Sequence, residues 1–182
     1  DFGRLVVGWI ELDVEAPAGA VLDVLGYEGV QEGRPQLAAM MNNSFRYVTR
    51  AGRQIFVSTQ RRGLRYLRVA VHGADGDVVL HDVRVRLSTY PWATHGDFRC
   101  SDPRLNQIWD QCAYTLRLCS EDTFTDCPTY EQTLWTGDAC HADILTHLLV
   151  HGDARLPRRC LLLIADSLQR SPIAVSLVPA DW

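Results

Sequence analysis

The segment DCPTYEQTLWTGD, residues 126–138, places three carboxylates around one tryptophan. Glycoside hydrolysis needs two carboxyl groups, one of which protonates the leaving oxygen and must therefore stay neutral near the working pH. The negative charges of Asp126 and Asp138 would disfavour the charged form of Glu131. The ring of Trp135 would add desolvation. The segment thus has the residue types of one half of a glycosidase active site.

Helical spacing would bring these side chains together. If the chain is helical from Pro128 onward, three side chains fall at i, i+4 and i+7 on one face, namely Glu131, Trp135 and Asp138. A sugar could then pack its C–H face on the indole while aspartates accept hydrogen bonds from its hydroxyls.

The same residues also have a structural interpretation. Asp126 would cap a turn before Pro128, and Asp138 would cap the helix that follows. Trp135 would be an ordinary core anchor. Residue types and spacing alone leave both interpretations open.

Residues 1 to about 90 have the pattern of short β-strands. LVVGWIELDVEA alternates apolar and polar residues, and APAG supplies a turn. FRYVTRAGRQIFVST repeats this form, with Ala51-Gly52 between two short strands as in a hairpin. Four arginines fall at outward positions, which is typical of a solvated sheet face: Arg65, Arg68, Arg84 and Arg86. Several short strands with Gly and Pro turns predict an antiparallel β-sandwich.

After Tyr90-Pro91 the apolar period becomes helical. Ser101 and Asp102 before Pro103 suit a helix N-terminus, and apolar residues at three- and four-residue intervals predict an amphipathic helix over 103–119 with one buried face. Similar patterns predict helices over about 138–150, ended by Gly152, and over about 156–169. Three helices with wide apolar faces cannot close a core alone, so we expect helical hairpins stacked side by side and more chain.

Composition argues against several classes of protein. The formal net charge is −4, whereas a nucleic-acid partner requires a basic surface. The sequence has no apolar run of about twenty residues, which is the length that a membrane-spanning helix requires. The cysteines include no C-x-x-C pair, and the histidines at 141, 147 and 151 lack an acidic ligand set, so we expect reduced thiols and no zinc site. The compartment and the oligomeric state stay open.

The run DCPTYEQTLWTGDA resembles the active-site signature of the bacterial α-L-rhamnosidases, glycoside hydrolase family 78, in which a D-C-P, an E, a W and a G-D-A recur at this spacing. GDFRCSDPRLNQIWDQCAYTLRLC is similar to the segment by which that family enters its catalytic barrel, and RRGLRYLRV resembles the last strands of its preceding sandwich. The resemblance extends over most of the chain. It implies a mixed, multidomain fold, with an antiparallel β-sandwich at residues 1–95 and the first helices of an (α/α)6 toroid, incomplete here, at residues 96–182.

Carried over residue by residue, the resemblance makes Glu131 the general acid. Asp126 and Asp138 fall on carboxylates that bind the rhamnose hydroxyls, and Trp135 falls on a sugar-contacting aromatic. The implied reaction is hydrolysis of a terminal α-L-rhamnoside with inversion, with a carbohydrate partner and without a metal or cofactor. The general base lies later in the family's barrel, outside this sequence, so we expect the 182 residues alone to be inactive.

Two alternatives remain. Position 130 is Tyr where the family usually has Arg, which leaves open whether the sugar is rhamnose or a relative. The chain could also be a noncatalytic carbohydrate-binding or scaffold module that keeps the sugar pocket. A helical toroid could equally serve an enzyme that acts on another sugar, or a polysaccharide lyase.

Overall fold

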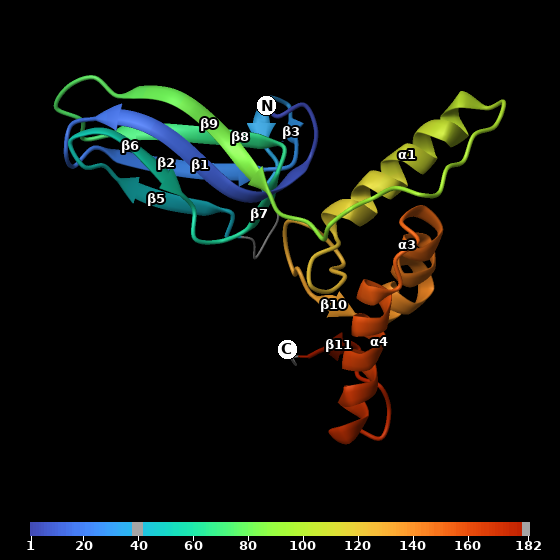
Figure 1. Ribbon diagram of the computed structural model, residues 1–182. Coiled ribbons are helices and arrows are strands. Elements are labelled where there is room, and N and C mark those ends of the chain that lie inside the picture. Colours follow the sequence, from blue (N-terminus) through green and yellow to red (C-terminus); the bar gives the residue numbers. More distant parts are fainter. Residues whose placement is uncertain (38–41, 180–182) are drawn as a thin grey trace. The chain divides into compact units, whose positions relative to one another are not determined.

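A computed structural model describes residues 1–37 and 42–179 of the chain (Figure 1). The chain divides into two compact units, Asp1–Ser88 and Thr89–Trp182. The first consists of antiparallel strands and the second mainly of helices. The predicted fold class, a β-sandwich followed by the first helices of a hairpin domain, is confirmed.

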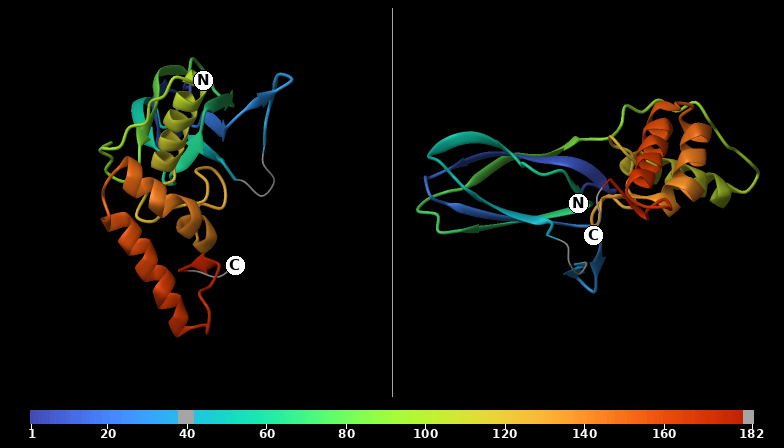
Figure 2. Two further views of the ribbon diagram at one scale, coloured as in Figure 1. Left: turned by 90° about the vertical axis from the view of Figure 1, so that its right-hand side faces the viewer. Right: turned by 90° about the horizontal axis from the view of Figure 1, so that it is seen from below.

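The first unit has two principal sheets and a small hairpin. Its strands are β1 (Val6–Ala16), β2 (Val21–Tyr27), β3 (Val30–Gln31), β4 (Arg34–Pro35), β5 (Ser44–Val48), β6 (Gly52–Val57), β7 (Arg62–Leu64), β8 (Tyr66–His72) and β9 (Val79–Leu87). In one sheet β1 pairs with β9 and, over different parts of its length, with β6 and β7. The other sheet has the order β5-β2-β8, and β3 pairs with β4. All these pairs are antiparallel, and Figure 2 shows the strands of the unit in two layers.

The core of this unit lies between the two sheets. Alternate residues of β1 and β2 point inward and are fully or almost fully buried, namely Ile10, Leu12, Val14, Leu22 and Val24. Their spacing of two is the pleat of the strand, which places successive side chains on opposite faces. The alternation seen in the sequence therefore marks the inner face of each sheet.

The hairpin predicted around Ala51-Gly52 is wrong. β5 belongs to the sheet of β2, whereas β6 pairs with β1 in the other sheet. The two strands instead meet through their inner faces, where the rings of Tyr47 and Phe56 stack with centroids 4.2 Å apart. The turn between them crosses from one layer to the other because aromatic burial across the core, and not ladder pairing, joins the two strands.

Three of the four outward arginines form ion pairs with carboxylates. Glu11, only 4% exposed, forms ion pairs with Arg84 and Arg86 on the neighbouring strand β9. Arg65 pairs with Asp1. A buried carboxylate needs such partners, since an isolated charge out of water is costly. The predicted solvated face is confirmed for Arg84 and Arg86, whose side chains are 57% and 58% exposed while they pair with Glu11.

Gly8 fits a close approach of β1 to β9. Its φ is +155°, and a Cβ there would lie 1.9 Å from the carbonyl oxygen of Arg86. We expect Gly8→Ala to lower the unfolding free energy of the strand unit by about 2 kcal/mol or more. Gly3→Ala is the control, because Gly3 also has a positive φ (+78°) but open space around its Cβ position. Calorimetric unfolding compares the two, and equal losses would contradict the steric cause.

The second unit contains the predicted helices. α1 spans Pro103–Leu118, and its N-cap Asp102 accepts a hydrogen bond from the Arg104 amide at 2.9 Å. The next helix runs on through α2 (Thr136–Asp138), a π-helical turn (Ala139–Asp143) and α3 (Ile144–Val150), and α4 spans Arg155–Asp166 before the 3-10 turn Ser167–Gln169. Short strands β10 (Leu134–Trp135) and β11 (Leu177–Val178) pair with each other. All three helices predicted from the sequence are confirmed.

The helices of this unit bury only part of their apolar surface. The core contains Leu116, Phe124, Leu134, Ala139, Leu156, Cys160, Ile164 and Val178. Large apolar side chains on the same helices are exposed, among them Leu105, Ile108, Leu145, Leu149, Leu161 and Leu162. The single buried face predicted for the whole of 103–119 is therefore found only near the C-terminal end of α1. No helix among the described residues is long and apolar enough to cross a membrane.

Candidate active site

The segment between Thr125 and Leu134 is a closed loop and not a helix. Asp126 and Thr133 lie at its base, where the Asp126 amide donates to the Thr133 carbonyl and the Thr133 amide donates to Asp126 Oδ1, both at 3.1 Å. Gln132 Nε2 donates to the Pro128 carbonyl at 2.8 Å across the loop. The helix predicted from Pro128 onward is therefore wrong. The helix does not form because the aspartate side chain accepts a hydrogen bond from a backbone amide and so competes with the hydrogen bonds of a helix.

Glu131 lies at the exposed turn of this loop. Glu131 and Gln132 have φ angles of +51° and +55°, in the left-handed region that few residues other than glycine adopt. Such strained positions cluster at functional sites, because the surrounding structure must hold them there. The loop thereby directs the Glu131 side chain outward. The carboxyl is exposed, so the desolvation predicted for it from the sequence is wrong.

Trp135 holds the Glu131 carboxyl. The indole Nε1 donates to Glu131 Oε2 at 2.8 Å, and the backbone of Trp135 is fixed by pairing with Leu177 of β11. A hydrogen bond of this length restricts the direction in which the carboxyl points. The structure therefore brings Glu131 and Trp135 together, as the sequence predicted, although by a turn and not along a helical face.

The two aspartates have different settings. Asp126 is half-buried, and its Oδ2 accepts from the Cys127 thiol at 2.9 Å while its Oδ1 accepts from the Thr133 amide, so its side chain closes the loop and does not cap a turn before Pro128. Asp138 is exposed in the first helical turn and makes no side-chain capping bond, so the alternative of a capping Asp138 is wrong. Its negative charge there complements the helix dipole. Within residues 1–37 and 42–179, no ion pair or hydrogen bond joins either aspartate to Glu131.

Asp143 is a carboxylate that the sequence analysis missed. It ends the π-helical turn Ala139–Asp143, and the pKa of its carboxyl is raised to about 7, first by burial and then by the charges of Asp138 and Asp126. A π-helical turn brings residues five apart onto one side, which explains why Asp138 lies near enough to act. The like-charge effect sought around residue 131 is thus found at Asp143. Helical spacing alone gave no signal for it, because α-helical geometry places residues 138 and 143 on different faces.

Asp143 and Asp126 line a cavity of about 450 Å³ beside the loop. Its other walls come from the C-terminal half of α1 and from the helix after the π-helical turn. This volume falls in the range of small-molecule sites. The helical unit therefore combines a hollow bordered by two acidic side chains with an exposed, tryptophan-held carboxyl.

The raised pKa of Asp143 predicts a pH dependence of stability. Its pKa in the folded chain, about 7, exceeds the ordinary value of 3.8. Its contribution to the stability of the folded chain is therefore fully present below about pH 4 and is lost as the pH rises through 7. We expect the unfolding free energy of the helical unit to fall by about 2 kcal/mol more between pH 5 and pH 8 in the unaltered chain than in Asp143→Asn. Urea titrations followed by circular dichroism at 222 nm measure both. Identical pH profiles would contradict the assignment.

A second cluster in this unit joins α3 to the segment before α1. His147 is fully buried, and the ring of His151 stacks on Trp92 with centroids 4.9 Å apart. Burial, and then the neighbouring His151, lowers the pKa of His147 to about 4, so this ring is neutral near pH 7. Within the described ranges no group of three or more His, Cys, Asp or Glu side chains could hold a metal ion. The cluster is an aromatic packing contact that fixes residues 90–96 on α3.

Two family models match the chain. The model described as bacterial alpha-L-rhamnosidase concanavalin-like domain matches residues 1–87, and the one described as bacterial alpha-L-rhamnosidase 6 hairpin glycosidase domain matches residues 93–182. No curated protein matches the chain.

Solved structures are similar over nearly the whole chain. A GH78 family rhamnosidase of Bacillus sp. GL1 is 43% identical with a TM-score of 0.95, over 100% of this chain and 19% of that one. A rhamnosidase from Klebsiella oxytoca with rhamnose bound is 23% identical with a TM-score of 0.79, over 91% of this chain and 35% of that one. A Streptomyces avermitilis α-L-rhamnosidase complexed with L-rhamnose is 20% identical with a TM-score of 0.74, over 99% of this chain and 18% of that one. The last two show the fold alone. The chain thus spans between about a fifth and a third of the length of these relatives.

Proposed function

Since the chain belongs to the bacterial α-L-rhamnosidase family, we propose that it supplies the general acid of an inverting glycoside hydrolase that removes terminal α-L-rhamnosyl groups. Glu131 is that acid. Asp126 and Asp138 bind hydroxyls of the sugar, and Trp135 contacts its ring. The general base comes from outside residues 1–182.

The bond between Trp135 Nε1 and Glu131 Oε2 is the observation that carries this proposal. An acid catalyst must place its proton within hydrogen-bond reach of the glycosidic oxygen, so its direction matters as much as its protonation. The indole engages one carboxyl oxygen and leaves the other to carry the proton. The left-handed turn at Glu131 and Gln132 presents that carboxyl on the surface of the helical unit, where a sugar can reach it.

The chemistry divides between this chain and the missing base. Glu131 gives its proton to the glycosidic oxygen as the bond to the anomeric carbon breaks, which releases the aglycone as an alcohol. Water attacks the opposite face of the sugar and loses its proton to the base. The product is rhamnose of inverted anomeric configuration. Without the base, the 182 residues alone are expected to give no substantial hydrolysis.

Asp143 is a third carboxyl group in the same unit. It is largely protonated below pH 7, so it adds little negative charge to that of Asp126 and Asp138. This lets two aspartates stay available for sugar hydroxyls beside a third, neutral carboxyl.

A panel of aryl glycosides tests this function in the complete polypeptide of the gene. We expect cleavage of the α-L-rhamnoside, with β-L-rhamnose as the first anomer seen by proton NMR. Binding of rhamnose without cleavage would favour a noncatalytic carbohydrate-binding module, and cleavage of another glycoside alone would favour a different sugar. Release of the α anomer would overturn inversion.

A further inference from the structure

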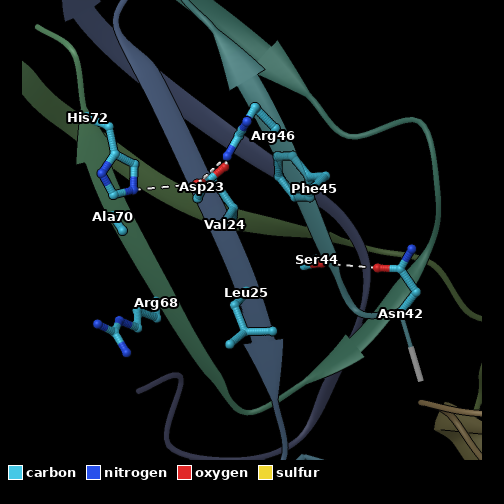
Figure 3. Close-up of a pocket in the computed structure, with 10 residues that line it drawn as sticks. All are labelled: Asp23, Val24, Leu25, Asn42, Ser44, Phe45, Arg46, Arg68, Ala70 and His72. Carbon is cyan, nitrogen blue, oxygen red and sulfur yellow. Dashed lines mark hydrogen bonds and ion pairs between the residues drawn. The ribbon is translucent and has the colours of Figure 1, made fainter. Parts of the chain in front are cut away.

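The outer face of the three-stranded sheet β5-β2-β8 carries a cavity of about 760 Å³ (Figure 3). Its walls are mainly residues of these strands that point away from the core, together with the core residues Val24 and Phe45 and with Asn42 just before β5. The volume is within the range of small-molecule sites. This cavity lies in the strand unit, whereas the proposed catalytic loop belongs to the helical unit.

One side of the cavity is a fixed ion-pair network. Arg46 Nε and Nη2 donate to the two carboxylate oxygens of Asp23 at 2.7 and 2.8 Å, and His72 Nε2 lies 3.4 Å from Asp23 Oδ2. The hydrogen bonds from Arg46 lower the pKa of Asp23, so the carboxylate stays charged. The Arg46 side chain is nevertheless 65% exposed, so its remaining N–H groups face solvent. The pair presents both donors and acceptors on a planar, rigid platform.

Arg68 adds a positive charge that no ion pair in the described part of the chain compensates. It lies on β8 opposite Leu25 of β2, and its guanidinium is drawn in Figure 3 away from the Asp23 pair. Among the described residues it makes no hydrogen bond or ion pair, unlike Arg84 and Arg86 on the other sheet, which pair with Glu11. With Asp23 matched by Arg46, the cavity has one surplus positive charge.

The floor between the charged groups is apolar. Leu25 and Ala70 are half-buried on neighbouring strands, where Leu25 lies opposite Arg68 and Ala70 lies opposite Asp23 (Figure 3). On the far strand the Ser44 hydroxyl donates to Asn42 Oδ1 at 3.0 Å and can accept a further bond. An apolar floor ringed by donors and acceptors suits a ring with one hydrophobic face and polar substituents around its edge.

We propose that this face binds an acidic saccharide, with the sugar carboxylate on Arg68, the hydroxyls on the Asp23 and Arg46 pair and on Ser44, and the C–H face on Leu25 and Ala70. Charge complementarity selects the acidic sugar over a neutral one, because the surplus charge at Arg68 is available to a carboxylate. The hydroxyl contacts select a sugar over a simple carboxylate. The inference goes beyond the proposed function and does not depend on hydrolysis.

Methyl β-D-glucuronide and methyl β-D-glucoside are the matched probes, since they differ only in the carboxylate. We expect the glucuronide to bind the 182-residue chain with a Kd on the order of 1 mM and the glucoside at least about tenfold more weakly. Sodium acetate is the third probe, and it should bind at least about tenfold more weakly than the glucuronide. Amide chemical shifts in nitrogen-15 NMR titrations report affinity and location together, with the changes on β2, β5 and β8.

Arg68→Gln removes the charge while it keeps a polar side chain of similar length. It should weaken glucuronide binding by about tenfold or more. Arg50→Gln is the control, because Arg50 is exposed in the same unit and lies outside the cavity, and it should leave binding unchanged. Equal binding of glucuronide and glucoside, equal binding of acetate, equal effects of the two variants, or shifts confined to residues 89–182 would each overturn the proposal. None of these results bears on cleavage, so the two proposals fail separately.

Discussion

Glu131→Gln in the complete polypeptide should lower kcat for an alkyl α-L-rhamnoside by about two to four orders of magnitude. An alkoxide is a poor leaving group, so the reaction with such a substrate depends on proton donation to the glycosidic oxygen. Glutamine keeps the shape of the side chain and can still accept the hydrogen bond from Trp135 Nε1. The variant therefore removes the proton and little else.

The leaving group of the substrate separates an acid from a structural residue. The dinitrophenolate ion of a dinitrophenyl rhamnoside leaves without being protonated. Glu131→Gln should therefore reduce kcat for this substrate far less than for the alkyl rhamnoside. A residue that only shapes the loop would affect both substrates alike. Asp166→Asn is the control, because Asp166 is an exposed carboxylate at the end of α4, and it should leave both rates within about twofold. Equal losses for both substrates, or unaltered turnover, would remove Glu131 from the role of general acid.

Helices of this chain could be predicted from local signals alone. Asp102 before Pro103 gives the N-cap of α1, and Gly152, with φ +74°, follows the end of α3. Such signals act within one or two turns, and the sequence displays them completely. The burial of α1 could not be predicted in the same way, since periodicity identifies an apolar face but not the element that covers it.

Strand pairing and the loop over residues 126–133 could not be predicted without information from distant residues. Alternation in FRYV and RQIFV shows which side chains point inward, yet both hairpin pairing and a crossing between sheets satisfy it. In the loop, the Asp126 side chain bonds Thr133 seven residues later, and the spacing of Glu131 and Trp135 gives no sign of this contact. The i, i+4 distance between Glu131 and Trp135 therefore gave the correct contact for an incorrect local geometry.

Asp143 shows the limit of spacing arguments for electrostatics. Three aspartates at 126, 138 and 143 are visible in the sequence, but which of them loses solvent depends on the π-helical turn and on the cavity beside α1. Desolvation, the first cause of its raised pKa, is a property of the packed chain. A sequence can therefore nominate carboxylates for a site without deciding which of them is neutral.

Phe124→Ala should cost the helical unit about 3 to 5 kcal/mol of unfolding free energy. Phe124 is fully buried, its ring lies 5.3 Å from that of His147, and its amide donates to Cys160 Sγ at 3.4 Å. It thus connects α3 and α4 to Thr125, the residue that precedes the 126–133 loop. Loss of the ring leaves a cavity at this junction, which α3 and α4 cannot close without moving.

Phe98→Ala provides the matched comparison in the same unit. Phe98 is 39% exposed and contacts Trp109 of α1 with ring centroids 5.7 Å apart, so its loss should cost about 1 kcal/mol or less. Urea unfolding followed by circular dichroism at 222 nm measures the unfolding free energy of the helical unit in both variants. The thermal unfolding transition of the strand unit, followed by calorimetry, should not change. Because the loop begins after Thr125, Phe124→Ala should also loosen the Glu131 turn, so rhamnoside turnover in the complete polypeptide should fall with stability. A loss below about 1 kcal/mol for Phe124→Ala would mean that the helical unit is held together elsewhere.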